Sequence, residues 1–420
     1  MARLYNTFEF TGELAFPKEP TVINDMGTSG WKKKQQSLII KESNSNSAFV
    51  KMEAIFHPNK ESQVFTSQKG LFGEKSENVK IDWDDRLKDS IVDSVPDYRK
   101  TVIDLTPPDV DKNEYFNNRR EIYNLENKEN PTQADKTKLA ELYDKVRELL
   151  PERKEFLHKF DAIDYLSDKL EGLKGKKFRV KGNIVKSYYN GTFYTTYEPQ
   201  SIELVSDEYT NSLSLQLDLF YKKDAVDDKS FKKNGMLYFD TYIIAYDNQH
   251  KKDVFFPQKT VFNGSKLDME NERHAALVKF FKDTFTVSKS KEVNHIAVEA
   301  KVVNGAEAVE FNESHLTAKQ KDMILLGLAE LNDFKPRGTV LGENVDEIRI
   351  IKPLLKEFNT TNNFKLGAVV STFSPEQLVY VPLESQSKPK EDTTTQTTQP
   401  ETTADIGDVF EDDDLLGLLD

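Results

Sequence analysis

The N-terminal part of the chain alternates apolar and polar residues with the period of half-buried β-strands. In TFEFTGELAF (7–16) every second residue is apolar or glycine, and two prolines follow soon after. WKKKQQSLIIKES (31–43) and AFVKMEAIFH (48–57) continue as two expected strands, with the turn-forming SNSNS between them. The pattern therefore predicts three consecutive strands before residue 58.

Residues 58–155 break this rhythm. GLFGEKSENVKIDWDDRL (70–87) and VPDYRKTVIDLTPPDVD (95–111) are predicted to be loop-rich, because their apolar residues follow neither period. The segment 131–160 has apolar residues at helical spacing and predicts a helix. We interpret the whole stretch as an insertion.

The β pattern resumes after residue 160. DAIDYLSDKLEGL (161–173) predicts a short helix, and 174–206 predicts two long strands joined near Asn190–Gly191. An Asn-Gly pair between alternating strands is the strongest short-range hairpin signal, since both residues accept positive φ. Without the insertion the order is β-β-β-α-β-β, which is that of the OB-fold, a small Greek-key barrel.

A second β-rich region is expected over 207–385. Strand patterns at 212–221, 235–247 and 252–263 precede an amphipathic helix at 271–285, and 294–312 predicts a second hairpin with Asn-Gly at its turn, 304–305. This order favours a second OB-like barrel. The expected fold class is therefore mainly β with helical insertions, in the α+β class.

Charge and composition change towards the C-terminal end. Segment 386–420 has two lysines and ten acids and so carries −8, which leaves −5 of the chain's −13 for residues 1–385. Its first half, 386–404, is rich in Thr, Gln and Pro and predicts a disordered linker, because it cannot bury enough apolar surface to offset ordering entropy. Segment 405–420 joins acids to four leucines.

These segments carry a family resemblance. YNTFEFTGELAFPKEP resembles the opening strand of bacterial-type single-stranded DNA-binding proteins, and AFVKMEAIF stands where that family has its central aromatic-basic strand. YLSDKLEGLKGKKFRVKGNIVKSYYNGTFYTTYEPQSIELV is similar to its helix and final hairpin. The family's tip ends in Pro-Phe rather than Leu-Leu-Asp, and the insertion and second β domain are foreign to the simple bacterial protein. Large variants of this kind look most like phage-encoded ones.

The resemblance implies an OB-fold domain at 1–206, interrupted at about 58–155, that binds single strands of DNA. Such binding needs cations for phosphates and aromatic faces for bases. Residues of these types cluster on the expected strands; for each the alternative is a place in the core or on a solvated face. The candidate nucleic-acid-binding residues are Trp31, Lys32, Lys33, Lys34, Lys51, Arg179, Lys181, Lys186, Tyr188, Tyr189, Phe193, Tyr194 and Tyr197.

The chemistry of a catalytic site is not apparent in the sequence. The chain has no cysteine, its six histidines form no metal-binding pair, and GLFGEKS (70–76) lacks the spacing of a phosphate loop. The acidic DWDD (82–85) has the carboxylates that a hard cation requires, but a solvated acidic loop is the preferred interpretation. We expect no enzyme activity, no metal and no cofactor.

The acidic segment 405–420 is predicted to recruit replication or recombination proteins, because acids beside apolar residues suit a basic-rimmed apolar pocket. The candidate partner-binding residues are Phe410, Glu411, Asp412, Asp413, Asp414, Leu415, Leu416, Leu418, Leu419 and Asp420. We therefore predict a cytoplasmic protein that protects single-stranded DNA during replication or recombination. The alternative is a non-enzymatic protein-binding scaffold or virion component.

Overall fold

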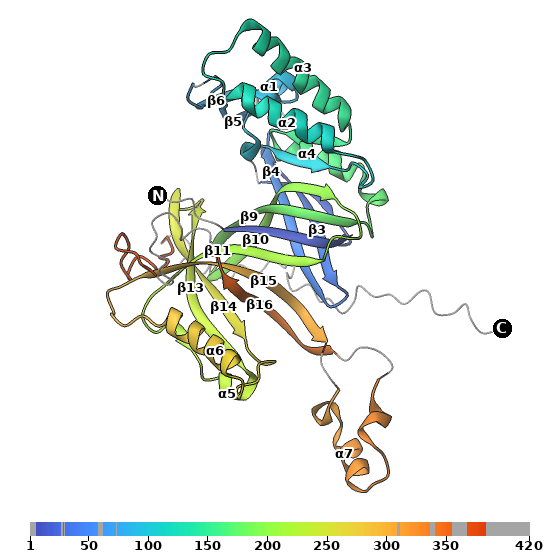
Figure 1. The fold of residues 1–420 in the computed structure, drawn as a ribbon, viewed down its shortest axis with the longest axis vertical. Coiled ribbons are helices and arrows are strands. Elements are labelled where there is room, and N and C mark those ends of the chain that lie inside the picture. The colour runs from blue at the N-terminus through green and yellow to red at the C-terminus, as the bar shows by residue number, and fades with distance from the viewer. Residues whose placement is uncertain are drawn as a thin grey trace, which may run out of the picture. The chain divides into compact units, whose positions relative to one another are not determined.

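Five strands of the N-terminal region close into a ring. The structure is a computed structural model, and it describes residues 6–26, 28, 30–57, 62–72, 74–308, 311–336, 341–354 and 368–383. The strands are β1 (Asn6–Ala15), β3 (Lys32–Ser43), β4 (Asn46–Phe56), β9 (Lys177–Tyr189) and β10 (Thr192–Leu204). Antiparallel pairings join β1–β3, β3–β4, β9–β10 and β9–β1, and a parallel pairing joins β10 to β4 (Figure 1). The first ring therefore runs β1-β3-β4-β10-β9 and back to β1.

A second ring repeats this connectivity. Its strands are β11 (Ser212–Tyr221), β13 (Met236–Asp247), β14 (Lys252–Asn263), β15 (Asn294–Ala308) and β16 (Leu341–Pro353). The pairings β11–β13, β13–β14, β15–β16 and β15–β11 are antiparallel, and β14–β16 is parallel. One helix precedes the fourth strand of each ring, α4 (Lys159–Ser167) in the first and α6 (Glu272–Phe285) in the second. The prediction of a β-rich fold is confirmed.

The two rings are hydrogen-bonded to each other. Strand β1 also pairs with β11, with Phe8 opposite Leu215, so all these strands belong to one mixed sheet. The turn between β3 and β4 contacts β15, where Asn46 Nδ2 donates to Val302 O over 3.2 Å. All described residues up to Val381 form one compact unit. The division into domains near residue 206 stays a prediction.

The two Asn-Gly pairs have different structures. Asn190 and Gly191 both have positive φ, 47° and 85°, and join β9 to β10 as the sequence predicts. The hairpin expected at 304–305 is wrong, because β15 runs through it as one strand. Gly305 has φ +139°, and a Cβ there would lie 2.0 Å from Ser45 O. This glycine therefore permits the close approach of a second backbone rather than a turn.

The cores of both rings come from the inward positions of alternating strands. Phe8, Phe10 and Leu14 of β1 are almost fully buried in one cluster with residues of both rings. Gly12 lies between them on the same strand, and a Cβ there would lie 2.1 Å from Lys41 O of β3. The strand glycine therefore allows β3 to cross β1 and the ring to close.

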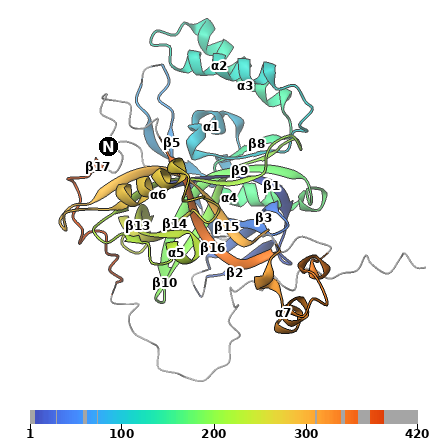
Figure 2. The same cartoon turned by 60° about the horizontal axis from the view of Figure 1, so that its bottom comes forward.

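The insertion has its own core and extends the sheet. Its elements are β5 (Gln63–Gln68), β6 (Glu77–Asp82), α1 (Asp89–Ser94), β7 (Thr101–Asp104), α2 (Asn113–Glu126), α3 (Gln133–Leu149) and β8 (Arg153–Phe156). Helix α3 confirms the helical spacing and begins with a capping box between Thr132 and Asp135, but it ends at Leu149, and the last part of the expected helix forms β8 instead. Helices α2 and α3 of the insertion lie side by side (Figure 2). The expectation of loops at 70–87 and 95–111 is wrong in part, because β6 and β7 lie there and β7 pairs in parallel with β10. Both strands are too short for a clear period.

The remaining elements are short. They are β2 (Thr21–Asp25), β12 (Val226–Asp227), α5 (Phe231–Asn234), α7 (Ala318–Leu325) and β17 (Ala368–Val369). Strand β2 pairs with β3 at the edge of the sheet. The linker 386–404 and the acidic segment 405–420, with all its candidate partner-binding residues, lie outside the described residues.

Candidate nucleic-acid interface

The outward side of β3 and β4 is a surface of mixed aromatic, aliphatic and basic side chains, which we call the β3–β4 face. Along β4, Ala48, Val50, Met52 and Ala54 are buried and the alternate residues point away from the core. The antiparallel register sets the outward residues of the two strands opposite each other. The β3–β4 face consists of Lys33, Gln35, Ser37, Ile39, Lys41, Ser47, Phe49, Lys51, Glu53 and Ile55.

Two apolar side chains of this face remain open to solvent. Phe49 is 47% exposed and Ile55 is 50% exposed. The parallel pairing of Tyr197 with Val50 puts the outward Thr196 of β10 at the level of Phe49. Tyr194, two residues nearer the hairpin turn, is also exposed. Phe49 and Tyr194 therefore belong to one continuous outer surface.

Basic residues share the β3–β4 face with the exposed Phe49 ring, on the side towards Ile55. Lys33 Nζ lies 2.7 Å from Glu53 Oε1, and Lys51 Nζ contacts the same oxygen. Burial alone would raise the pKa of Glu53, but hydrogen bonds from both lysines hold it below its usual value. Because one carboxylate is shared by two ammonium groups, this part of the face keeps a net positive charge.

Trp31 and Lys32 lie at the start of β3, at one end of the β3–β4 face. The Trp31 ring is 36% exposed and meets the His57 ring edge to face at 5.4 Å. Lys32 Nζ lies 3.5 Å from Asp25 of β2, and both side chains are open to solvent. An exposed pair of this kind contributes little stability, so Lys32 can exchange its partner for a phosphate.

Lys34 and Lys186 are not available to phosphates in this structure. Lys34 is buried, contacts Asp164 and lies 4.7 Å from the centroid of the Phe160 ring. Lys186 is buried and donates to Thr195 Oγ1 and Gln258 Oε1, each over 2.6 Å. Both occupy inward positions of their strands. We leave both out of the interface.

Arg179 and Lys181 lie on the outward side of β9, away from the β3–β4 face. In the first ring β9 is separated from β3 by β1 and from β4 by β10. Arg179 Nη2 lies 2.6 Å from Glu203, and Lys181 Nζ lies 3.0 Å from Glu9. The structure does not bring these two cations together with Lys33 and Lys51.

The tip of the β9–β10 hairpin has both packed and exposed aromatic rings. Tyr188 and Phe193 lie 5.1 Å apart and contact Tyr380 at 5.1 Å and 5.3 Å. Tyr189 is 58% exposed and points to the other side, as Tyr194 does. Of the four, Tyr189 and Tyr194 are exposed and make no contact with Tyr380, whereas Phe193 is 39% exposed but packs against Tyr380.

Tyr197 is a core residue. Its ring lies 4.8 Å from Phe10 and 5.5 Å from Phe8, inside the first ring, and burial raises the pKa of its hydroxyl. Phe49 and Ile55 were not among the sequence-based candidates, but their side chains are exposed on the outer side of the ring. Their signal is the strand AFVKMEAIF, in which Ala, Val, Met and Ala share one face and Phe, Lys, Glu and Ile share the other.

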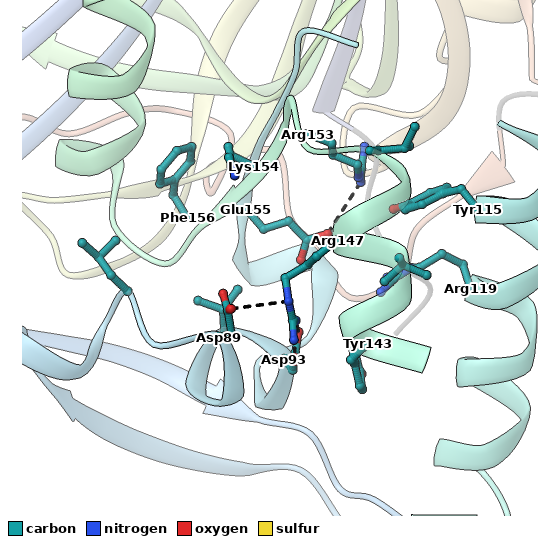
Figure 3. Close-up of a pocket in the computed structure, with 14 residues that line it drawn as sticks. Asp89, Asp93, Tyr115, Arg119, Tyr143, Arg147, Arg153, Lys154, Glu155 and Phe156 are labelled. Carbon is teal, nitrogen blue, oxygen red and sulfur yellow. Dashed lines mark hydrogen bonds and ion pairs between the residues drawn. The ribbon is translucent and has the colours of Figure 1, made fainter. Parts of the chain in front are cut away.

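The insertion has a pocket of about 270 Å³ between α1, α2, α3 and β8 (Figure 3). Its arginines are engaged in ion pairs: Arg147 with Asp93 at 2.8 Å, Arg119 with Asp97 at 2.5 Å and Arg153 with Glu155 at 3.8 Å. Burial raises the pKa of Asp93 despite the neighbouring Arg147. Each of these guanidinium groups has a carboxylate of its own, whereas Lys33 and Lys51 share one, so the pocket is a weaker candidate for phosphate than the β3–β4 face.

The structure places the acidic segment 82–85 beside the insertion's hairpin. Asp82 Oδ1 accepts from Gln63 Nε2 over 3.3 Å, and Asp85 lies 2.5 Å from Lys88. Within the described ranges, no three His, Cys, Asp or Glu side chains are grouped in a way that could hold a metal ion. No helix among the same residues is long and apolar enough to cross a membrane.

Comparison with solved structures gives a weak likeness. No family model matches the chain, and no curated protein matches it. A solved structure of a deletion mutant of the single-stranded DNA-binding protein from Thermus aquaticus is similar over 72% of this chain and 89% of that chain, with 9% identity and a TM-score of 0.29. A score this low does not establish a shared fold. The function proposed below is therefore based on the β3–β4 face.

The buried Lys186 makes stability depend on pH. Burial lowers the pKa of its ammonium to about 8, against 10.5 for an exposed lysine. Between these values the unfolded chain binds more protons than the folded one, so stability rises with pH. Relative to a Lys186→Met variant, we expect the parent protein to gain up to about 3 kcal/mol from pH 7 to pH 10.5, at ~1.4 kcal/mol per pKa unit.

Urea unfolding at pH 7 and at several values up to pH 10.5 measures this gain. A Lys181→Met variant is the control, since it makes the same change at an exposed lysine of the same strand. Equal pH slopes for the parent and Lys186→Met would show that Lys186 does not titrate in this way.

Proposed function

We propose that this protein binds single-stranded DNA on the β3–β4 face, and that its two rings are OB-folds. The support for the fold is connectivity: each ring has strand order 1-2-3-5-4-1 with a helix before the fourth strand. In an OB-fold, oligonucleotides bind on strands two and three and on the loops between strands one and two and strands four and five. In the first ring these are β3, β4, the segment before Trp31 and the β9–β10 hairpin.

The observation that carries the proposal is the exposed Phe49 on that face, with Lys51 at the level to one side of it and Lys41, paired with Ser47, at the level to the other. The apolar surface of Phe49 that is open to water is surface that a bound ligand could bury with a gain in free energy. A base stacked on the ring would cover it, and the lysines would meet the phosphates on either side. Trp31, Tyr189 and Tyr194 supply further exposed rings around the same strands.

Salt dependence tests this proposal. Binding of oligo-dT should weaken linearly with the logarithm of salt concentration, with a slope of about −0.7 for each phosphate contacted. A Lys33→Gln, Lys51→Gln double variant should reduce the slope by about 1.4. The measurement is a fluorescence anisotropy titration at several salt concentrations. Binding that is insensitive to salt would instead favour the alternative, a protein-binding scaffold or virion component.

The proposed function includes no catalysis. The support is the composition of the β3–β4 face, which is aromatic, aliphatic and basic, and on which the one carboxylate, Glu53, is engaged by two lysines. Binding of single-stranded DNA by such a face is of use both in replication and in recombination. The assignment to those processes rests on the resemblance described above.

We also propose that the acidic segment 405–420 recruits replication proteins. Four leucines beside four consecutive acids suit a basic-rimmed apolar pocket on a partner, and the polar segment before them supplies reach. Changing Leu415, Leu416, Leu418 and Leu419 to Ser, with every acid kept, should abolish capture of partners from host lysate. The leucine variant has the parent's charge, so solubility alone cannot explain the loss.

Deleting 405–420 removes seven acids and should leave oligo-dT affinity equal or higher, most clearly at low salt. Affinity is measured by the same anisotropy titration. Partner capture that survives the leucine changes would show that the segment acts only through its charge.

A further inference from the structure

We propose a second single-strand contact on the insertion, in the groove beside the β5–β6 hairpin. This inference rests on the proposed function and names a site that the face of the first ring does not include. The groove has a volume of about 390 Å³ and is lined by Phe65, Thr66, Asn78, Val79, Lys80 and Arg99, which we call the β5–β6 groove. We expect this groove to bind a nucleotide of the same DNA strand that binds the β3–β4 face.

Phe65 is the most exposed aromatic ring in the described part of the chain, at 77%. Its neighbours Val64 and Ile81 point inward and pack with Val95, so the alternation of the strand turns Phe65 outward. Lys80 stands directly opposite Phe65 in the hairpin, with its Nζ 5.6 Å from the ring centroid. Because Phe65 lies on a paired β-strand, its backbone is already ordered before a base stacks on the aromatic ring.

The cations of the groove differ from those of the larger pocket. Among the described residues, Lys80 and Arg99 form no ion pair with an acid, whereas Arg119, Arg147 and Arg153 each form at least one. Arg99 lies 5.4 Å from the centroid of the Tyr98 ring, and both side chains are exposed. The β5–β6 groove therefore offers two cations and an exposed ring, the groups that phosphates and a base require.

The groove is connected to the first ring at two points. At one, Gln200 Nε2 of β10 donates to Tyr98 O over 2.5 Å, and β7 pairs with β10. At the other, the N–H of His57 donates to Ser62 Oγ over 3.5 Å, and Trp31 rests on the His57 ring. The part of the insertion that forms the groove is thus attached to the end of β4 beside Trp31 and to β10, the strand that holds Tyr194. The occupant favoured by the positive charge of the groove and by these attachments is a DNA strand that extends from the β3–β4 face.

The experiment compares a short oligo-dT of about 10 nucleotides with a long one of about 40, since one OB-fold covers roughly 4–16 nucleotides. Phe65→Ala should weaken binding of the long oligonucleotide about tenfold and leave the short one unchanged. Phe65→Trp keeps an aromatic face and should restore binding. A Lys80→Gln, Arg99→Gln double variant should lower the salt slope for the long oligonucleotide alone by about 1.4.

Tyr123→Ala is the matched control, because Tyr123 is an exposed ring of the same insertion but lies outside the groove. Melting temperatures confirm that each variant folds. If the parent binds neither oligonucleotide, both the proposed function and this inference are wrong. If the parent binds both and Phe65→Ala changes neither, or changes both equally, the second contact is overturned while the first stands. A change in self-association without a change in DNA binding would assign the groove to a second copy and would also overturn it.

Discussion

Phe49→Ala should weaken binding of oligo-dT by about 10- to 100-fold, while the melting temperature stays near that of the parent. The size follows from the value of a base–aromatic stack, ~1–3 kcal/mol. Stability should hold because the Phe49 ring is about half exposed and lies on the outer side of β4, so its removal leaves no cavity in the core. Fluorescence anisotropy with labelled oligo-dT gives the affinity, and thermal unfolding gives the stability.

Val50, the buried residue next to Phe49, provides a control that should change stability rather than affinity. Val50→Ala changes a fully buried side chain one residue along β4 and should lower stability with little direct effect on affinity. Phe116→Ala, on the exposed side of α2, controls for the loss of any surface ring. Unchanged affinity in Phe49→Ala would remove the β3–β4 face from the DNA site.

The sequence was informative wherever period-two alternation was long. Strands β1, β3 and β4 follow it, and the Asn190–Gly191 turn confirms the chemistry that predicts it. The same alternation decides which side chains reach solvent. Because successive residues of a strand point to opposite faces, Lys34 faces inward while Lys33 faces outward. Residue type alone suggested that all the lysines of WKKK would be exposed.

Long-range packing accounts for what the sequence could not predict. Lys186 is buried because Gln258 of the second ring covers it, and nothing near Lys186 in the sequence reveals that contact. Tyr197 is a core residue because Phe8 and Phe10 of β1 lie against it. Gly305 looks like a turn residue until the backbone at Ser45 is placed beside it. In each case a residue far away in the chain determines the role.

Tyr380 is the clearest example of such a contact, and its removal should have the largest effect on stability. Its ring lies 5.1 Å from Tyr188, 5.3 Å from Phe193 and 5.1 Å from Phe256. Its hydroxyl donates to Asp247 Oδ2 over 2.7 Å. It thereby joins the segment before Val381 to the hairpin tips of both rings.

Asp247 depends on this arrangement. Burial would raise the pKa of its carboxyl, but hydrogen bonds from His250, the Gln249 N–H and Tyr380 hold it below the usual value. Tyr380→Ala should therefore lower the free energy of unfolding by about 3 kcal/mol, through lost ring packing and a lost hydrogen bond to a charged group. Tyr380→Phe keeps the ring and should cost about 1.5 kcal/mol, because only the hydroxyl is removed.

Urea unfolding at pH 7 measures both values, and a double-mutant cycle with Tyr188→Ala shows whether the two rings act together. We expect a coupling energy of about 1 kcal/mol between them. Tyr189→Ala, next along β9 but turned to the opposite side, should show no coupling with Tyr380→Ala and should instead weaken oligo-dT binding. If Tyr188→Ala weakened binding without loss of stability, Tyr188 would be a DNA-stacking residue. The packing against Tyr380 would then be secondary to its function.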